Sequence, residues 1–111
     1  MAASEKLTNR VREALESVSL VKEKKMFSGV SFMVNDKMCI NIGADYLMVR
    51  IDPTMYQLLL EKEGCSPVVM KGREIKGFVY VDEEALVTKK KLAYWIDLAL
   101  EFNPKAKRSK K

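Results

Sequence analysis

The chain of 111 residues contains no histidine and only two cysteines. Without histidine it lacks the usual general base at neutral pH and the commonest metal ligand, and serine–histidine or cysteine–histidine catalysis is excluded. Cys39 and Cys65 cannot supply a four-cysteine or mixed cysteine–histidine zinc site within one chain. Neither GxGxxG nor GxxxxGK[ST] occurs, so no phosphate-binding loop is visible. We therefore expect no enzyme, no metal and no cofactor.

Long apolar runs are also missing from the sequence. The longest extend over only a few residues, so we expect no membrane-spanning segment. The N-terminus is polar and does not resemble a secretory signal. Two thiols in a chain without such a signal are typical of a reduced, cytoplasmic protein, and this is the location we expect.

The net charge of +5 is concentrated at the C-terminus. Residues 104–111 carry five basic residues and no acidic one, and removing these five from 20 leaves 15 basic residues against 15 acidic ones. We interpret 4–103 as one domain, neutral overall, and 104–111 as a basic flexible tail. The tail either solvates the terminus or adds contacts to phosphates.

Apolar residues at helical spacing predict three helices, over 4–18, 52–64 and 88–103. Ser4 is a good N-cap for the first helix, and Pro53 fits the first position of the second. Runs typical of strands lie at 22–27, 30–34, 38–42, 46–51, 67–70 and 77–81. Short turns between these runs predict an α+β fold. We expect a two-layer sandwich in which an antiparallel sheet of five to six strands has helices on one face.

Helices on one face of a sheet cannot cover the apolar side chains of both faces. Met33, Cys39, Tyr46 and Met48 are therefore candidates for a partner-binding surface, and methionine-rich surfaces adapt readily to partners. Which set faces outward depends on the register at the turn 35–37, because a shift of one residue inverts it. The alternative is that each of these residues belongs to the core.

Basic residues support a second hypothesis, nucleic-acid binding through the tail and surface cations. The candidate contacts are Lys24, Lys25, Arg50, Lys71, Arg73, Lys76, Lys105, Lys107 and Arg108. The segment 71–77 sets three cations around two glycines, which is compatible with an anion-binding loop or with a solvated turn between strands. A small-anion site in this loop is a third hypothesis.

Several blocks of sequence resemble the TfoX/Sxy N-terminal domain family. They are Lys24–Val30, Phe32–Asn35, Lys37–Cys39, Leu47–Pro53, Met70, Gly72-Arg73, Lys76–Val81 and Leu92–Ala99. The resemblance implies a bacterial cytoplasmic protein with a two-layer α+β fold similar to that of type III secretion chaperones. The best-known members of the family regulate natural competence together with the cyclic-AMP receptor protein. They carry a second, C-terminal domain, which we do not expect in this chain, and the family brings no established catalytic residues.

The residues and the resemblance together predict a non-catalytic protein-interaction or regulatory module, linked to transcription. Its protein partner is unidentified, and a homodimer is one option. Nucleic-acid binding is the alternative function, and we expect no interaction with membranes.

Overall fold

Six antiparallel strands form one sheet in the computed structural model of the chain, which describes residues 4–26 and 29–105. The strands are β1 (Val21–Met26), β2 (Gly29–Val34), β3 (Lys37–Ile42), β4 (Tyr46–Arg50), β5 (Cys65–Met70) and β6 (Arg73–Asp82). Their order across the sheet is β1-β2-β3-β4-β6-β5. The first four strands thus form a meander, and the hairpin of β5 and β6 adds to it through β6.

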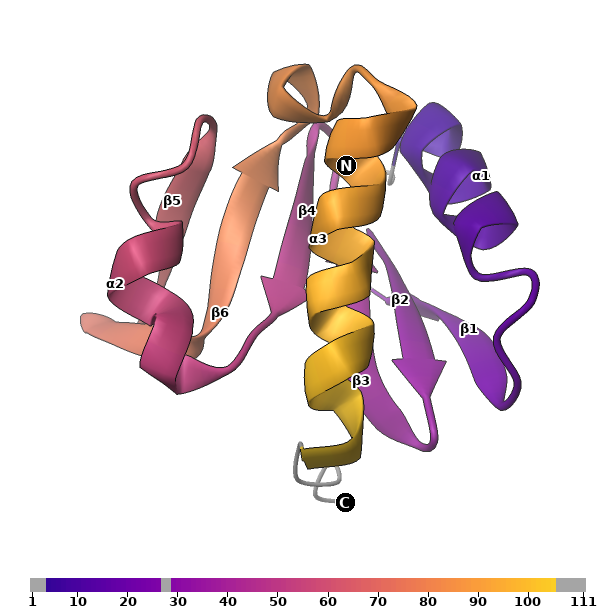
Figure 1. Ribbon diagram of the computed structural model, residues 1–111, viewed down its shortest axis with the longest axis horizontal. Coiled ribbons are helices and arrows are strands. Elements are labelled where there is room, and N and C mark those ends of the chain that lie inside the picture. Colours follow the sequence, from indigo (N-terminus) through magenta and orange to yellow (C-terminus); the bar gives the residue numbers. More distant parts are fainter. Residues whose placement is uncertain (1–3, 27–28, 106–111) are drawn as a thin grey trace.

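The helices all lie on one face of this sheet (Figure 1). They are α1 (Glu5–Ala14), α2 (Tyr56–Leu59) and α3 (Lys89–Phe102), with 3-10 turns η1 (Pro53–Met55), η2 (Glu83–Leu86) and η3 (Asn103–Lys105). The long helix α3 crosses the middle of the sheet and contacts β3 and β4. The prediction of an α+β two-layer fold with an antiparallel sheet is confirmed.

The predicted caps start the helices. The side chain of Ser4 accepts a hydrogen bond from the amide of Leu7 at 3.2 Å, and that of Thr88 accepts one from Lys91 at 3.1 Å. The lengths predicted for the first two helices are wrong. The first ends at Ala14, after which the chain turns tightly and Leu20 adopts a φ of 60°, and the second has one α-helical turn after η1.

The β2–β3 and β5–β6 hairpins each close with a two-residue turn. In the β2–β3 turn Asn35 and Asp36 have φ of 55° and 64°, and in the β5–β6 turn Lys71 and Gly72 have φ of 52° and 78°. Two successive left-handed residues match the twist of paired strands, which favours two-residue hairpins. The turn at Asn35 confirms the predicted hairpin. The expected loop over 72–77 is wrong, because β6 already begins at Arg73.

The covered face of the sheet carries aliphatic side chains that the helices close off from water. Ile40, Ile42, Leu47 and Val49 are all fully buried there. The core cluster consists of Leu7, Val11, Leu15, Val30, Phe32, Val34, Cys39, Ile40, Ile42, Leu47, Val49, Ile51, Tyr56, Leu59, Val79, Val81, Ala85, Leu86, Leu92, Trp95, Ile96 and Ala99. Burial of this apolar surface is the main source of stability for the fold.

Both edges of the sheet resist pairing with another strand. The exposed part of β1 reads Lys22-Glu23-Lys24-Lys25, and β5 contains Pro67, which has no N–H to donate. Charged residues and proline are the usual means by which edge strands avoid edge-to-edge association.

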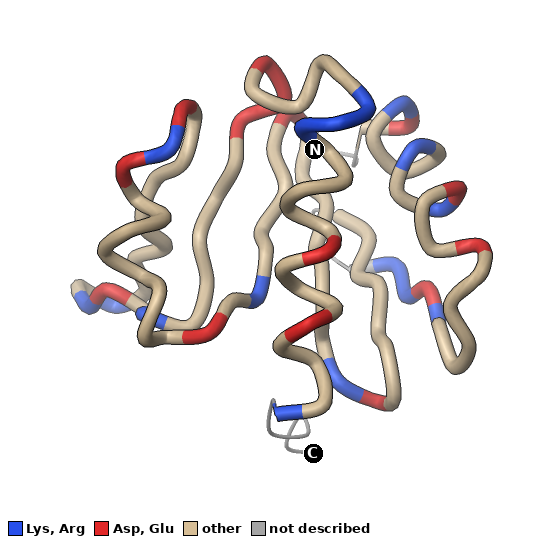
Figure 2. The backbone as a smooth tube through the Cα atoms, viewed as in Figure 1, with Lys and Arg blue, Asp and Glu red and all other residues tan. Residues whose placement is uncertain are grey.

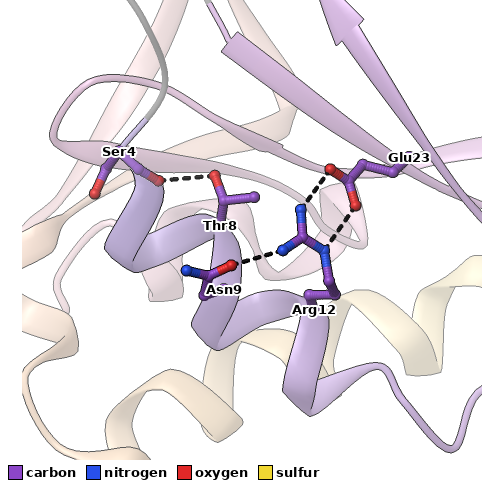
Figure 3. A network of polar contacts seen from close by, with 5 residues as sticks. All are labelled: Ser4, Thr8, Asn9, Arg12 and Glu23. Atoms are coloured by element: carbon purple, nitrogen blue, oxygen red, sulfur yellow. Dashed lines mark hydrogen bonds and ion pairs between the residues drawn. The ribbon is translucent and has the colours of Figure 1, made fainter.

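A polar network fastens α1 to the edge strand β1 (Figure 3). The guanidinium of Arg12 donates to both carboxylate oxygens of Glu23, at 2.9 and 2.7 Å, and to Oδ1 of Asn9 at 2.6 Å. The hydroxyl of Thr8 donates to the carbonyl of Ser4 at 2.7 Å. The hydrogen bonds from Arg12 lower the pKa of the Glu23 carboxyl, so this pair is fully formed at neutral pH.

The other end of the helical layer is held by Asn103. Its Nδ2 donates to the carbonyl of Val34 at 3.1 Å, and its Oδ1 accepts from Nδ2 of Asn35 at 2.8 Å. The amine of Lys37 donates to the carbonyl of Asn103 at 3.0 Å. Because Asn103 is buried, these bonds satisfy groups that have no access to water.

Candidate protein-interaction face

The second face of the sheet is covered by none of the described helices (Figure 1). Strand alternation places on it the residues between the core positions. This helix-free face comprises Ser31, Met33, Asn41, Tyr46, Met48, Arg50, Phe78 and Tyr80, and none of them belongs to the core cluster. The pairing of β4 with β6 sets Met48 opposite Tyr80 and Arg50 opposite Phe78, so side chains from the two strands are neighbours.

Aromatic contacts organise the middle of the helix-free face. The rings of Tyr46 and Tyr80 meet edge to face, with centroids 4.9 Å apart. Tyr46 lies against Gly43, where an added Cβ would come within 2.2 Å of its ring, so a larger residue at this position must displace the ring. Burial raises the pKa of the Tyr46 hydroxyl, with the neighbouring Tyr80 and Asp45 adding to the effect, so the ring stays neutral at physiological pH.

A cation lies at one end of the same face. The guanidinium carbon of Arg50 is 5.6 Å from the centroid of the Phe78 ring, within the range of a cation–π interaction. Its Nη1 donates to the carbonyl of Met38 at 3.4 Å. Desolvation lowers the pKa of Arg50 from its usual value, but an arginine remains charged at neutral pH. Arg50 was expected as an anion contact and instead packs on an aromatic ring.

Three of the four residues predicted for the partner surface lie on the helix-free face. Met33 and Tyr46 are half-buried there, and Met48 is only 6% exposed. The fourth, Cys39, is wrongly predicted, because it is 1% exposed and belongs to the core cluster. The register between β2 and β3 shifts at this point, pairing Phe32 with Ile40 and Met33 with Met38, and so leaves Cys39 as an extra residue.

Phe78 and Tyr80 are members of the face that the sequence interpretation missed. Both are half-buried and alternate with the core residues Val79 and Val81. The same alternation is readable in the sequence once β6 is paired with β4, because the aromatic residues then fall beside Tyr46 and Met48.

The helix-free face also holds buried polar groups. Ser31 is fully buried, and Oδ1 of Asn41 is buried with no hydrogen-bond partner among the described residues. Leaving such an acceptor unpaired costs about 1–3 kcal/mol. The residues of this face are therefore not all chosen for stability.

The thiols stay protonated at neutral pH. Burial raises the pKa of Cys39 to about 12, against the opposing effect of the Arg50 charge, and raises that of Cys65 to about 11. Within residues 4–26 and 29–105, no three histidine, cysteine, aspartate or glutamate residues come together in a way that could hold a metal ion. In the same part of the chain, no helix is long and apolar enough to cross a membrane.

The predicted nucleic-acid contacts are spread over the molecule (Figure 2). Lys24 and Lys25 are exposed on the edge strand β1, whereas Arg73 and Lys76 are exposed on β6, four strand spacings away, or about 19 Å. Lys71 lies in the β5–β6 turn and Lys105 in η3, after α3. Lys107 and Arg108 lie outside the described residues. The described cations thus do not form one continuous basic surface.

The comparison with known families agrees with this fold and with the resemblance noted in the sequence. The profile of the TfoX N-terminal domain matches residues 13–103. This chain belongs to the TfoX N-terminal domain family. The match spans the sheet, α3 and the end of α1, and therefore includes every strand that builds the helix-free face.

One solved structure shares the fold of this TfoX N-terminal domain. It is the crystal structure of a protein from Pseudomonas syringae, with a TM-score of 0.64 and 14% sequence identity. The similarity covers 86% of this chain and 97% of that chain. No curated protein matches the sequence.

Proposed function

We propose that this TfoX N-terminal domain is a non-catalytic protein-interaction module whose binding surface is the helix-free face. The observation that supports this proposal is a set of partly exposed aromatic, methionine and arginine side chains on an uncovered sheet. Met33, Tyr46, Arg50, Phe78 and Tyr80 are all half-buried. These are the residue types enriched at protein interfaces, where they combine large contact area with few lost degrees of freedom.

The charges on this surface favour a second copy of the chain as the partner. Arg50 lies at one end of β4, and Asp82 lies opposite Tyr46 at the other end, about 13 Å along the strand. A two-fold axis through the middle of the face would set Arg50 of each copy against Asp82 of the other. Such an interface is isologous, as in most homodimers, and its charges are complementary.

We also propose a regulatory role linked to transcription, in the cytoplasm. Membership of the TfoX N-terminal domain family supports this role, because the regulators that the sequence resembles act on transcription. In that case the helix-free face would mediate contact with another copy or with a protein of the transcription apparatus.

Sedimentation equilibrium tests the homodimer directly. The wild type should self-associate at up to about 100 μM, where pairs of micromolar affinity are populated. Arg50→Asp and Asp82→Arg should each abolish association, because each sets like charges against one another. An equimolar mixture of the two variants should restore it, because both contacts then join opposite charges. Lys89→Asp, at an exposed lysine that begins α3 on the helical side, is the control and should associate like the wild type.

A monomeric wild type, or variants whose mixture does not associate, would rule out the second copy. A photo-crosslinking residue at position 80, compared with one at Gln57, an exposed position of α2 on the helical side, then tests for another protein in cells that make this one. Crosslinks specific to position 80 and lost in Tyr46→Ala support the interaction face. Equal crosslinking from both positions would overturn it.

A further inference from the structure

A cleft of about 380 Å³ opens on the helical side of the molecule, away from the helix-free face. The segment that follows α2 supplies Lys62 and Glu63 to its lining, and the first half of α3 supplies Lys90, Lys91, Tyr94 and Trp95. Its size is within the range of pockets that bind a small molecule or a few side chains.

One wall of the cleft is aromatic. The rings of Tyr94 and Trp95 are nearly perpendicular, with centroids 5.4 Å apart. Tyr94 is 39% exposed, whereas Trp95 is anchored in the core with 4% exposure. Nζ of Lys62 lies 4.8 Å from the centroid of the Tyr94 ring, so cationic and aromatic groups share the same surface. This wall can hold an apolar side chain beside a charged rim.

The rim of the cleft is cationic. Lys62, Lys90 and Lys91 line it together with a single carboxylate, Glu63. Lys91 and Glu63 approach to 3.5 Å, but both side chains are well exposed, so water and salt weaken the pair. Lys90 forms no ion pair with any described residue. The cleft therefore presents an excess of positive charge.

The lysines at the start of α3 lie where positive charge does not stabilise the helix. The first turn of α3 begins with Lys89-Lys90-Lys91 and contains no acidic residue. The N-terminus of a helix carries the positive end of its dipole, which favours acidic residues and disfavours cations. Local stability therefore does not explain three lysines here, whereas an anionic ligand in the adjoining cleft would.

We propose that this cleft binds an acidic segment of a protein partner, with an apolar side chain against Tyr94 and Trp95 and carboxylates at Lys62, Lys90 and Lys91. A nucleic-acid strand fits the surroundings less well, because the basic residues elsewhere are divided between distant parts of the sheet. The site lies on the opposite side of the sheet from the helix-free face, so the two proposals stand or fall separately.

The fluorescence of Trp95 provides the measurement, since this is the only tryptophan in the chain. The probe is a synthetic peptide of about ten residues, composed of aspartate and glutamate around a central phenylalanine, a length suited to groove recognition. The matched peptide has glycine in place of phenylalanine. A single-stranded DNA of about ten nucleotides, similar in charge, represents the other class of ligand.

The double variant Lys90→Glu/Lys91→Glu should lower the affinity for the acidic peptide by about tenfold or more, because it reverses the charge at the contact. Lys24→Glu/Lys25→Glu makes the same change of charge on β1 and should alter the affinity by about twofold or less, through long-range screening alone. Lys90→Glu should not lower the melting temperature, because the acidic residue suits the first turn of α3. Lys90→Glu alone should therefore weaken binding without lowering stability, which is the signature of a ligand site.

Four results would overturn the proposal. The first three are an acidic peptide that leaves the Trp95 fluorescence unchanged, an equal loss of affinity in the two double variants, and DNA that binds more tightly than the peptide. An equally tight complex with the glycine peptide would also overturn it, because the aromatic wall would then contribute nothing.

Discussion

The two faces of the sheet are built from the same strands yet differ in composition. On β4 the covered positions are Leu47 and Val49, both fully buried, whereas the alternate positions are Tyr46, Met48 and Arg50. On β6 the covered residues Val79 and Val81 alternate with Phe78 and Tyr80. Aliphatic side chains supply the packing that holds the fold together. The aromatic, sulfur-containing and cationic side chains on the other face are mostly half-buried in the monomer, and the rest of their surface is available for contact.

The largest expected effect compares neighbouring residues on the two faces. Leu47→Ala should lower the free energy of unfolding by about 2–5 kcal/mol, because it leaves a cavity beneath the helices. Met48→Ala should cost less, about 1–2 kcal/mol, because a site with no second layer above it can relax. Urea denaturation of both variants gives the two values. If both variants lose the same free energy of unfolding, the helix-free face is packed as tightly as the core.

The next effect concerns the attachment of the helical layer to the covered face. Asn103→Ala should lower the free energy of unfolding by about 1–3 kcal/mol, because the carbonyl of Val34 and the amide of Asn35 lose their buried partner. Hydrogen exchange should also accelerate in the last turn of α3 before it does in β4. Glu101→Ala, at an exposed position of the same helix, is the control and should leave both quantities nearly unchanged. If Asn103→Ala changes neither the free energy of unfolding nor hydrogen exchange, apolar packing alone holds the helical layer on the sheet.

Gly43→Ala perturbs the helix-free face without removing any of its side chains. The added methyl group displaces the Tyr46 ring and should separate it from Tyr80, at a cost of about 1 kcal/mol or less. Near-ultraviolet circular dichroism should report the lost ring contact, and sedimentation should report weaker association. Gly77→Ala is the matched control, because no atom lies within 4 Å of the added group. If the two variants behave identically, the contact between Tyr46 and Tyr80 does not contribute to association.

The smallest effect is expected at the edge of the sheet. Arg12→Gln removes the contact with Glu23 and should lower the melting temperature at pH 7 by about 2 °C or less, because both side chains reach solvent. The folded protein lowers the pKa of Glu23, so the pair stabilises above the unfolded pKa near 4.3 and is lost as the pH falls through the lower, folded value. The difference from the wild type should therefore shrink as the pH falls below the unfolded pKa and vanish once the pH lies below the lowered pKa of Glu23. If the difference in melting temperature persists in acid, it comes from packing of the aliphatic part of the Arg12 side chain.

Much of this fold could be predicted because its signals are local. Ser4 and Thr88 are caps whose side chains bond nearby amides, and the Asn35-Asp36 turn needs only two residues that tolerate positive φ. Strand alternation likewise made Met33, Tyr46 and Met48 candidates for one surface, although the register at the turn 35–37 left the outward-facing set open. Each of these inferences uses residues that are at most three positions apart in the sequence.

The features that were missed depend on pairing between distant segments. The burial of Cys39 follows from a register shift between β2 and β3, which no single strand encodes. Phe78 and Tyr80 join the helix-free face only because β6 inserts between β4 and β5. The cleft beside Trp95 forms where the chain after α2 meets α3. The lysines that α3 contributes indicate an anionic ligand only once they are known to lie at the N-terminal end of that helix.

The charged strand β1 and the proline of β5 have a consequence for any assembly this chain forms. With neither border of the sheet able to accept another strand readily, copies cannot add end to end into a growing ribbon. The broad uncovered surface remains available for association, and a two-fold pair would use it up in both copies. Under the proposed pairing, self-association by this route would end at two copies, so a high concentration would not lead to fibres.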